Sequence, residues 1–293
     1  MEDRSGALDI TQAVTFLTTN GFHGPFAIST LRGGYWNQVM KVTCAEGTFV
    51  LKRYVEVLPS SLFPNLPEAE AAALERLKGL DVAPEPVGFW PEEKILIYAY
   101  VEGELWSDDM AAVAGLLQRK ERASSEGFRA VPWQPAQILE EGDRLLARCS
   151  SDKLSTRLRQ VRPQPVEIAP PDRLSLIHTD IGAGNLVGTG AGLRLIDWQC
   201  PAQGDLAEDV YSFLSPAFQI LNDRTPVAES DMFFQALDMP EIRDRYFLLR
   251  SCFAYRMAAY CCLRYQGATA DQALHDRYFA AMTAELEHVE QRP

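Results

Sequence analysis

Two pieces of the sequence are the most informative about the fold: Leu176-Ile-His-Thr-Asp-Ile-Gly-Ala-Gly-Asn-Leu-Val187, and the following Leu193-Arg-Leu-Ile-Asp-Trp-Gln199. Short apolar runs in both pieces predict strands, and these runs flank polar, glycine-containing turns. Asp180, Asn185 and Asp197 therefore fall at strand ends or in tight loops, where a chain can direct polar side chains toward a common point. We expect these three side chains to act together.

Two carboxylates and an amide oxygen are hard ligands of the kind that Mg²⁺ prefers, with waters and phosphate oxygens completing its shell. Phosphoryl transfer needs an oriented hydroxyl, metal on the β and γ phosphates, and neutralisation of the charge that builds on the transferring group. We assign Asp180 to the incoming hydroxyl as base or orienter, and Asn185 and Asp197 to Mg²⁺. His178 is expected to hold the catalytic loop through backbone hydrogen bonds.

The order and spacing of these residues resemble the aminoglycoside phosphotransferase and choline kinase superfamily, the small-molecule relatives of protein kinases. The matching pieces are His178-x-Asp180-x-x-x-x-Asn185, then Ile196-Asp197-Trp198-Gln199, then Gly204-Asp205-Leu206-Ala207-Glu208-Asp209. The resemblance implies an α+β, bilobal, protein-kinase-like fold. Its amino-terminal lobe would be a small antiparallel β-sheet with one helix, and its carboxy-terminal lobe would be larger and mainly helical.

The resemblance extends to the amino-terminal lobe. Arg32-Gly33-Gly34-Tyr35-Trp36-Asn37 is similar to the family's nucleotide-covering loop, so Gly33, Gly34 and Asn37 are expected to bind the nucleotide. Lys52 matches the lysine that contacts the α and β phosphates, and Glu70 is its expected ion-pair partner, with Glu68 as the competing candidate.

Two further segments take expected roles from the resemblance. The segment from Ile97 to Gly103 resembles the hinge whose backbone reads adenine, which makes Tyr98 and Tyr100 candidate nucleotide-binding residues. Of the acidic pair Asp205 and Asp209, the family suggests that the later one braces the catalytic loop. Acidic residues early in a helix also complement its dipole, so both are interpreted as structural support.

Local patterns agree with a β-rich amino-terminal part followed by a helical part. Runs of β-prone residues predict strands at 26–31, 38–44, 48–54, 87–90 and 94–100. Helical patterns cover residues 67–78, 108–122, 135–147 and 241–265. We place the lobe boundary between residues 101 and 102, which gives a nucleotide-binding lobe at 1–101 and a lobe at 102–293 with the catalytic loop, metal site and substrate pocket.

Composition limits the possible partners. The 293-residue chain is 47% hydrophobic and 23% charged, which suits a globular protein. Its net charge of −12 argues against nucleic acid as a partner and favours a cationic substrate, although surplus carboxylates also serve solubility. The six cysteines lack C-x-x-C spacing, and neither a signal peptide nor a membrane span is recognisable, so we expect a cytoplasmic protein without a membrane partner.

The sequence thus predicts an ATP- and Mg²⁺-dependent kinase that phosphorylates a hydroxyl of a small molecule, such as choline, an amino alcohol or an aminoglycoside. A protein kinase is the less favoured enzyme, because the chain between Asp197 and the helix at Val210 leaves no room for a long peptide-docking segment. The alternative from another class is a catalytically weak pseudokinase that binds a nucleotide or metabolite as a regulatory module.

Overall fold

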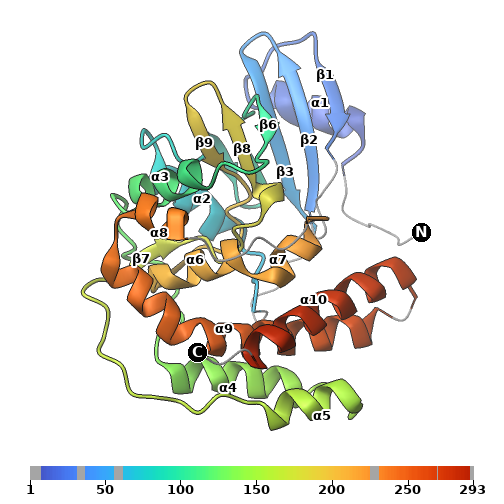
Figure 1. Cartoon of the computed structure of the whole chain (residues 1–293). Coiled ribbons are helices and arrows are strands. Elements are labelled where there is room, and N and C mark those ends of the chain that lie inside the picture. The colour runs from blue at the N-terminus through green and yellow to red at the C-terminus, as the bar shows by residue number, and fades with distance from the viewer. Residues whose placement is uncertain (1–7, 32–36, 56–61, 225–230, 269, 291–293) are drawn as a thin grey trace. The chain divides into compact units, whose positions relative to one another are not determined.

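The computed structural model describes residues 8–31, 37–55, 62–224, 231–268 and 270–290 (Figure 1). The chain divides into two compact units, the first formed by Met1–Glu104 with Val187–Pro201, and the second by Leu105–Leu186 with Ala202–Pro293. The structure therefore places Asp197 in the first unit, whereas the sequence-based boundary at 101/102 placed it in the second lobe. Contacts between residues far apart in the sequence bring Asp197 into the first unit, so a single boundary in the sequence cannot separate the two units.

The first unit is built on a five-stranded antiparallel sheet with the strand order β1-β2-β3-β5-β4. The strands predicted at 26–31, 38–44 and 48–54 are present and pair antiparallel in that order. The strands are β1 (Ala27–Thr30), β2 (Asn37–Cys44), β3 (Gly47–Tyr54), β4 (Pro86–Trp90) and β5 (Ile95–Ala99). Gly47, the first residue of β3 after the turn from β2, has a φ of +140°, a conformation that favours glycine.

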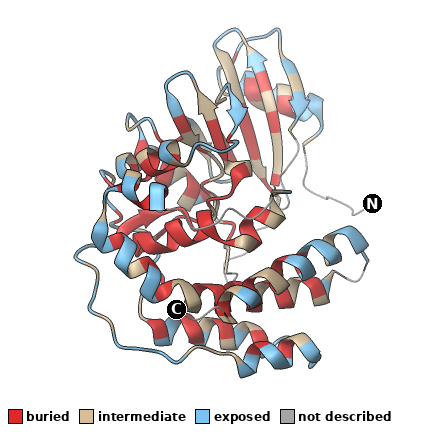
Figure 2. Cartoon of the chain, in the orientation of Figure 1, coloured by how far each residue is buried: buried red, intermediate tan, exposed pale blue. Residues whose placement is uncertain are grey.

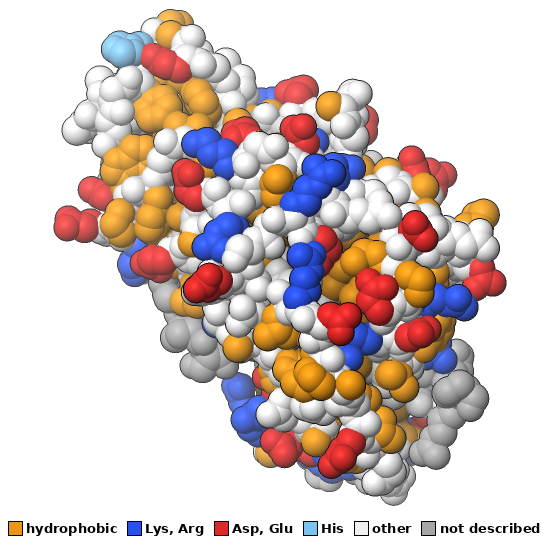
Figure 3. Space-filling view, turned by 90° about the vertical axis from the view of Figure 1, so that its left-hand side faces the viewer, with side chains coloured by type: hydrophobic (Ala, Val, Ile, Leu, Met, Phe, Trp, Pro, Cys, Tyr) orange, Lys and Arg blue, Asp and Glu red, His pale blue; other side chains and the backbone are white. Residues whose placement is uncertain are grey.

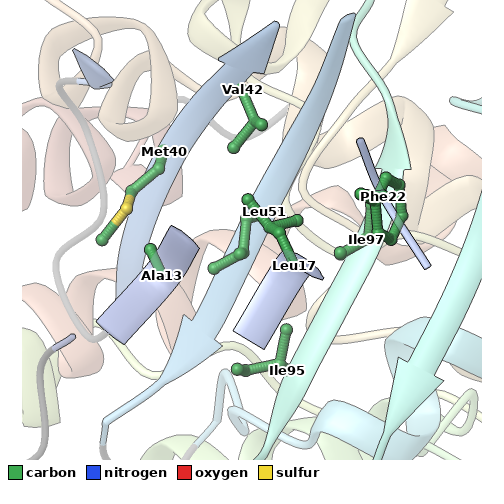
Figure 4. Close-up of a cluster of buried hydrophobic side chains, with 8 residues drawn as sticks. All are labelled: Ala13, Leu17, Phe22, Met40, Val42, Leu51, Ile95 and Ile97. Carbon is green, nitrogen blue, oxygen red and sulfur yellow. The ribbon is translucent and has the colours of Figure 1, made fainter. Parts of the chain in front are cut away.

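Helix α1 (Ile10–Thr19) packs its apolar side against one face of this sheet, and the sequence analysis did not predict it. Asp9 and Gln12 form a capping box at its start. Its buried Ala13 and Leu17 contribute to the hydrophobic cluster shown in Figure 4. Phe22 follows α1, and the strands contribute the remaining members: Met40 and Val42 from β2, Leu51 from β3, and Ile95 and Ile97 from β5.

Alternation along the strands sends the neighbouring residues to the opposite face. Leu51 lies in the α1 cluster, so Lys52 and Tyr54 in β3 point to the opposite face of the sheet. Tyr98 in β5 does the same, because its neighbour Ile97 lies in the α1 cluster. Helix α2 (Pro67–Leu77) contacts β4 and β5, begins with Pro67 at its first turn and buries Glu70. The pleat thus determines that Lys52 faces Glu70.

The second unit is mainly helical. Its helices are α3 (Met110–Lys120), α4 (Pro135–Leu146), α5 (Lys153–Gln160), α6 (Leu206–Leu214), α7 (Pro216–Leu221), α8 (Asp231–Leu237), α9 (Pro240–Gly267) and α10 (Gln272–Glu290). Helix α9 contacts α4, α5, α6, α7 and α10, and Figure 2 shows buried residues along its length. Tyr246, Leu249, Phe253 and Met257 recur at helical spacing along α9 and are all buried.

Short strands lie on either side of the segment quoted first. Strand β7 (Ser175–Ile177) pairs with β10 (Ala202–Gly204), and a three-stranded sheet has the order β6-β8-β9. These three strands span Glu104–Leu105, Leu186–Thr189 and Gly192–Leu195. Between β7 and β8, a single 3₁₀ turn, η1 (Ala183–Asn185), forms the end of the His178–Asn185 segment. The segment is therefore a strand, a tight loop and a second strand, as the sequence predicted.

The surface mixes charges of both signs. Figure 3 shows acidic and basic side chains interspersed over the face in view. Within the described ranges, none of the helices has the length and apolar character needed to cross a membrane.

Candidate active site

In the first unit, Lys52 is a buried lysine held by two carboxylates. Its side chain is only 2% exposed, and its Nζ lies 2.6 Å from Oε2 of Glu70 and 2.5 Å from Oδ1 of Asp197. The expected ion pair with Glu70 is present, and Glu68 is exposed on α2. The hydroxyl of Tyr54, two residues along the same strand, also donates to Glu70 Oε2. Lys52 therefore has a fixed position.

The electrostatics of this cluster keep Lys52 charged. Burial disfavours the ammonium form, but the negative charges of Asp197 and Glu70 outweigh burial and raise the pKa of Lys52 above its ordinary value. Burial also raises the pKa of Tyr98, whose side chain belongs to the same electrostatic cluster. The result is a fixed cation next to a half-buried carboxylate, because the Asp197 side chain is 34% exposed.

Asp197 adopts a backbone conformation that is uncommon for a residue with a side chain. Its φ is +64°, in the left-handed region. The loop is held from both sides, because Leu195 N–H donates to the Val82 carbonyl at 2.8 Å and the Trp198 indole donates to the Leu195 carbonyl at 2.8 Å. Strained positions of this kind persist where the surroundings hold them, and they cluster at functional sites.

Three amide side chains form a cluster beside this loop. Asn37 and Asn65 exchange two hydrogen bonds of 3.0 and 2.9 Å, and the Asn37 Nδ2 donates a further one to Oε1 of Gln199 at 3.0 Å. Asn37 and Asn65 are buried. Asn37, expected to bind nucleotide, thus has its side chain engaged within the protein. Gly33 and Gly34, the other residues of that expected loop, lie outside the described residues.

In the segment expected to be the hinge, two backbone N–H groups already donate hydrogen bonds within the protein. Ala99 N–H donates to the Glu85 carbonyl at 2.8 Å, and Tyr100 N–H donates to the Thr48 carbonyl at 3.0 Å. The side chain of Tyr98 is buried, and Lys41 Nζ lies 3.7 Å from the centre of the Tyr100 ring. A backbone donor for adenine would therefore have to come from beyond Tyr100.

In the second unit, the catalytic-loop sequence is anchored by Asp209. Its carboxylate accepts the backbone N–H of His178 at 2.9 and 3.1 Å and that of Thr179 at 2.9 Å. The expectation that Asp209 braces this loop is confirmed. Thr179 has a φ of +69°, so both proposed reactive carboxylates have a left-handed residue at or directly before them. Asp205 instead caps α6 through Ala207 N–H and pairs with Arg245.

Asp209 is neutralised by Lys120, whose side chain is fully buried at the end of α3. The Lys120 Nζ lies 3.2 Å from Asp209 Oδ2 and donates to the Leu176 carbonyl at 2.6 Å. The same lysine thus contacts the strand that leads into the loop and the carboxylate that anchors it. Sequence reasoning missed Lys120, because a lysine at a helix end normally complements the helix dipole in solvent.

Asp180 and Asn185 belong to one hydrogen-bonded turn. Asp180 N–H donates to Nδ1 of His178 at 3.3 Å, and Asn185 Nδ2 donates to the Asp180 carbonyl at 2.9 Å. Since the amide nitrogen of Asn185 is used in this way, its oxygen is the atom left for a cation. His178 itself is fully buried, so it positions the loop from inside.

Asn222, at the end of α7, closes this loop from the other side. Its Oδ1 accepts the Gly184 N–H at 3.0 Å. A Cβ placed on Gly182 would lie 2.4 Å from Asn222 Nδ2, and one on Gly184 would lie 2.4 Å from Oδ1. The two glycines are therefore needed for close packing of the loop against Asn222.

Comparison with known proteins identifies the family of this chain. Residues 27–246 match the model of the phosphotransferase enzyme family, to which the chain belongs. A thiamine kinase of Escherichia coli is 28% identical over 152 residues, which are 49% of this chain and 53% of that protein. The chain thus spans about half the length of the curated relatives it matches.

Solved structures of two proteins described as phosphotransferase or kinase share the fold. A putative aminoglycoside phosphotransferase from Ralstonia eutropha superimposes with a TM-score of 0.67 at 14% identity, covering 97% of this chain and 99% of that one. The choline kinase LicA from Streptococcus pneumoniae gives a TM-score of 0.64 at 13% identity, with coverage of 94% and 98%. The expected protein-kinase-like fold of the small-molecule branch is confirmed.

Proposed function

We propose that this chain transfers the γ-phosphoryl group of ATP to a hydroxyl group of a small molecule. The observation that carries the proposal is Lys52, buried and paired with both Glu70 and Asp197. In protein kinases, a lysine–glutamate ion pair and a metal-binding aspartate must both be in place for phosphoryl transfer. Membership of the phosphotransferase enzyme family and the relatives named as kinases support the same activity.

The available donor atoms suit magnesium. The Asp197 carboxylate and the Asn185 amide oxygen are hard ligands, and Mg²⁺ commonly takes only one or two protein carboxylates. Asn185 and Asp197 would hold the ion, which would supply positive charge to offset that of the nucleotide phosphates.

The residues of the two units would divide the work. In the first unit, Lys52 would bind the α and β phosphates, held in place by Glu70. In the second unit, the Asp180 carboxylate would orient the acceptor hydroxyl and take its proton as the hydroxyl oxygen bonds to the γ phosphorus. The bond from that phosphorus to the bridging oxygen breaks, ADP leaves, and a phosphate ester forms.

The acceptor is proposed to be a small hydroxylated molecule, with cationic compounds favoured. The net charge of −12 attracts cations at long range. In addition, the relative found by sequence is named a thiamine kinase, and one of the similar solved structures is a choline kinase. Thiamine, choline, ethanolamine and an aminoglycoside therefore form the first panel of acceptors to test.

The Asp180→Asn variant tests the mechanism. We expect ADP release with the active acceptor to fall by a factor on the order of 10² to 10⁴, while ATP affinity stays close to that of the unmodified protein. Asp172→Asn, the same change at an exposed position, is the matched control. Undiminished turnover in Asp180→Asn would remove the mechanism. ATP binding without turnover of any acceptor by the unmodified protein would favour the pseudokinase alternative.

A further inference from the structure

The backbone N–H groups on both sides of Asp180 donate hydrogen bonds to one helix, α6. Before Asp180, the Thr179 N–H donates to Oδ1 of Asp209 at 2.9 Å. After Asp180, the Ile181 N–H donates to Oγ of Ser212 at 2.8 Å. The peptide groups that flank the proposed reactive carboxylate are thus both attached to α6, and Ser212 is the attachment on the later side.

The position of Ser212 in α6 suits this contact. Asp209 and Ser212 are three positions apart, so their side chains project from the same face of the helix. Both residues are buried, and so is Ile181. A serine inside a helix commonly points to solvent or bonds to its own backbone, whereas this hydroxyl accepts a hydrogen bond from another segment. Removing it would take away the acceptor of a buried N–H group.

Helix α6 is itself fixed to α9 at two points. The Arg245 Nε lies 2.5 Å from Oδ2 of Asp205, which caps the start of α6. The Arg256 Nη2 lies 2.5 Å from Oε1 of Glu208, one residue before Asp209. A helix attached at both places provides a fixed support for the loop that bonds to it.

We propose that Ser212 is a positioning residue for Asp180. Together with Asp209, it fixes the two peptide groups between which Asp180 lies, and so determines where the carboxylate meets the acceptor hydroxyl. Ser212 acts only through the backbone of the loop. The effect on rate rests on the proposed phosphoryl transfer, because a misplacement of about 1 Å in a reacting group lowers a rate by about 10²-fold.

Steady-state kinetics of Ser212→Ala test the positioning role. We expect kcat with the active acceptor to fall by a factor of about 10 to 10². The KM for ATP should stay close to that of the unmodified protein, because Lys52 and Glu70 belong to the first unit. Ser155→Ala is the matched control: Ser155 is also buried, and its hydroxyl accepts the Asp152 N–H at 2.9 Å at the start of α5. It should leave kcat unchanged.

A double-mutant cycle separates positioning from a general loss of structure. Because Ser212 acts through the Asp180 carboxylate, Ser212→Ala should cause no further loss of turnover in the Asp180→Asn background. A serine that only stabilised the fold would lower turnover by the same factor in both backgrounds, and that result would overturn the proposal.

Hydrogen exchange tests the same contact without measuring activity. The Ile181 amide should exchange faster in Ser212→Ala than in the unmodified protein, while the Asp152 amide is unaffected; Ser155→Ala should show the reverse. Ser212→Cys has a similar volume and a weaker acceptor, so its exchange at Ile181 should be intermediate. This variant carries the test if Ser212→Ala does not fold. Unchanged exchange at Ile181 in the Ser212 variants would overturn the proposal.

Failure of this proposal differs from failure of the proposed function. Full turnover in Ser212→Ala beside an inactive Asp180→Asn variant would contradict only the positioning role of Ser212. Full turnover in Asp180→Asn would contradict the proposed mechanism of phosphoryl transfer, and the role of Ser212 with it.

Discussion

The Nζ of Lys120 lies 3.2 Å from the Oδ2 of Asp209, and neither side chain is exposed to solvent. This pair holds the backbone of His178 and Thr179 in place. Removing one partner of a buried ion pair leaves an uncompensated charge, which costs about 3 to 5 kcal/mol. We therefore expect Lys120→Met to lower the free energy of unfolding by that amount in urea titrations. Lys153→Met, at an exposed position, should change it by less than about 0.5 kcal/mol.

Glycine at position 182 is expected to be required for packing. In Gly182→Ala the new Cβ would lie 2.4 Å from Asn222 Nδ2, and overpacking of this kind costs about 1 to 3 kcal/mol. Nothing lies within 4 Å of a Cβ at Gly190, so Gly190→Ala is the control. Adding Asn222→Ala should relieve the clash, which a double-mutant cycle would detect as a combined loss smaller than the sum. Additive losses would show that Asn222 is not the obstacle.

The amide cluster around Asn37 should tolerate no exchange of donor for acceptor. In Asn37→Asp, a carboxylate oxygen replaces the Nδ2 that donates to Asn65 and Gln199, so acceptors face one another and a charge is buried. We expect a loss of about 2 to 3 kcal/mol in the free energy of unfolding. Gln164→Glu makes the same chemical change at an exposed position and should be close to neutral. Equal effects of the two substitutions would contradict the assigned hydrogen bonds.

Stability at acid pH should depend on Asp152. Burial alone would raise the pKa of this carboxyl, but hydrogen bonds from Tyr265, the Ser155 N–H and Gln266 lower it to about 2, from an ordinary value of 3.8. A depressed carboxyl pKa stabilises the folded state above the unfolded-state pKa, and this stabilisation is lost as the pH falls from 3.8 toward 2.

Urea titrations between pH 2 and 5 would measure this contribution. As the pH falls over that interval, the free energy of unfolding should decrease by about 1 kcal/mol less in Asp152→Asn than in the unmodified protein. This value allows for solvent screening. Asp244→Asn, at an exposed position of α9, should leave the decline unchanged. An unaltered slope in Asp152→Asn would show that its hydrogen bonds do not favour the ionised form.

The residues that local chemistry determines could be predicted from the sequence. Lys52 and Glu70 follow from a strand and a helix whose bounds were close to those observed, and β-alternation makes Lys52 and Tyr54 share a face. Helix α1 was missed because Ile10, Thr11 and several later residues are β-branched and lower the helix propensity. The Asp9–Gln12 capping box was the signal that could have revealed it.

Partners distant in sequence could not be predicted in the same way. Lys120 and Asp209 are 89 positions apart, and Asn37 and Gln199 are 162 apart, so no local pattern connects them. The amide of Asn222 is likewise set by the packing of α7 against the loop, which only the folded chain reveals. Sequence identified residue types suited to the chemistry, whereas the supporting contacts depend on tertiary structure.

The first unit is assembled from two separate pieces of chain, since Val187–Pro201 joins Met1–Glu104. The later piece contributes Asp197 and also Arg194, whose guanidinium pairs with Asp81. Recombination between relatives must therefore transfer both pieces together. A chimaera exchanged at a single crossover near residue 104 would combine Lys52 from one parent with the Asp197 loop from the other, so the two parts of this ion-pair cluster are constrained to be inherited together.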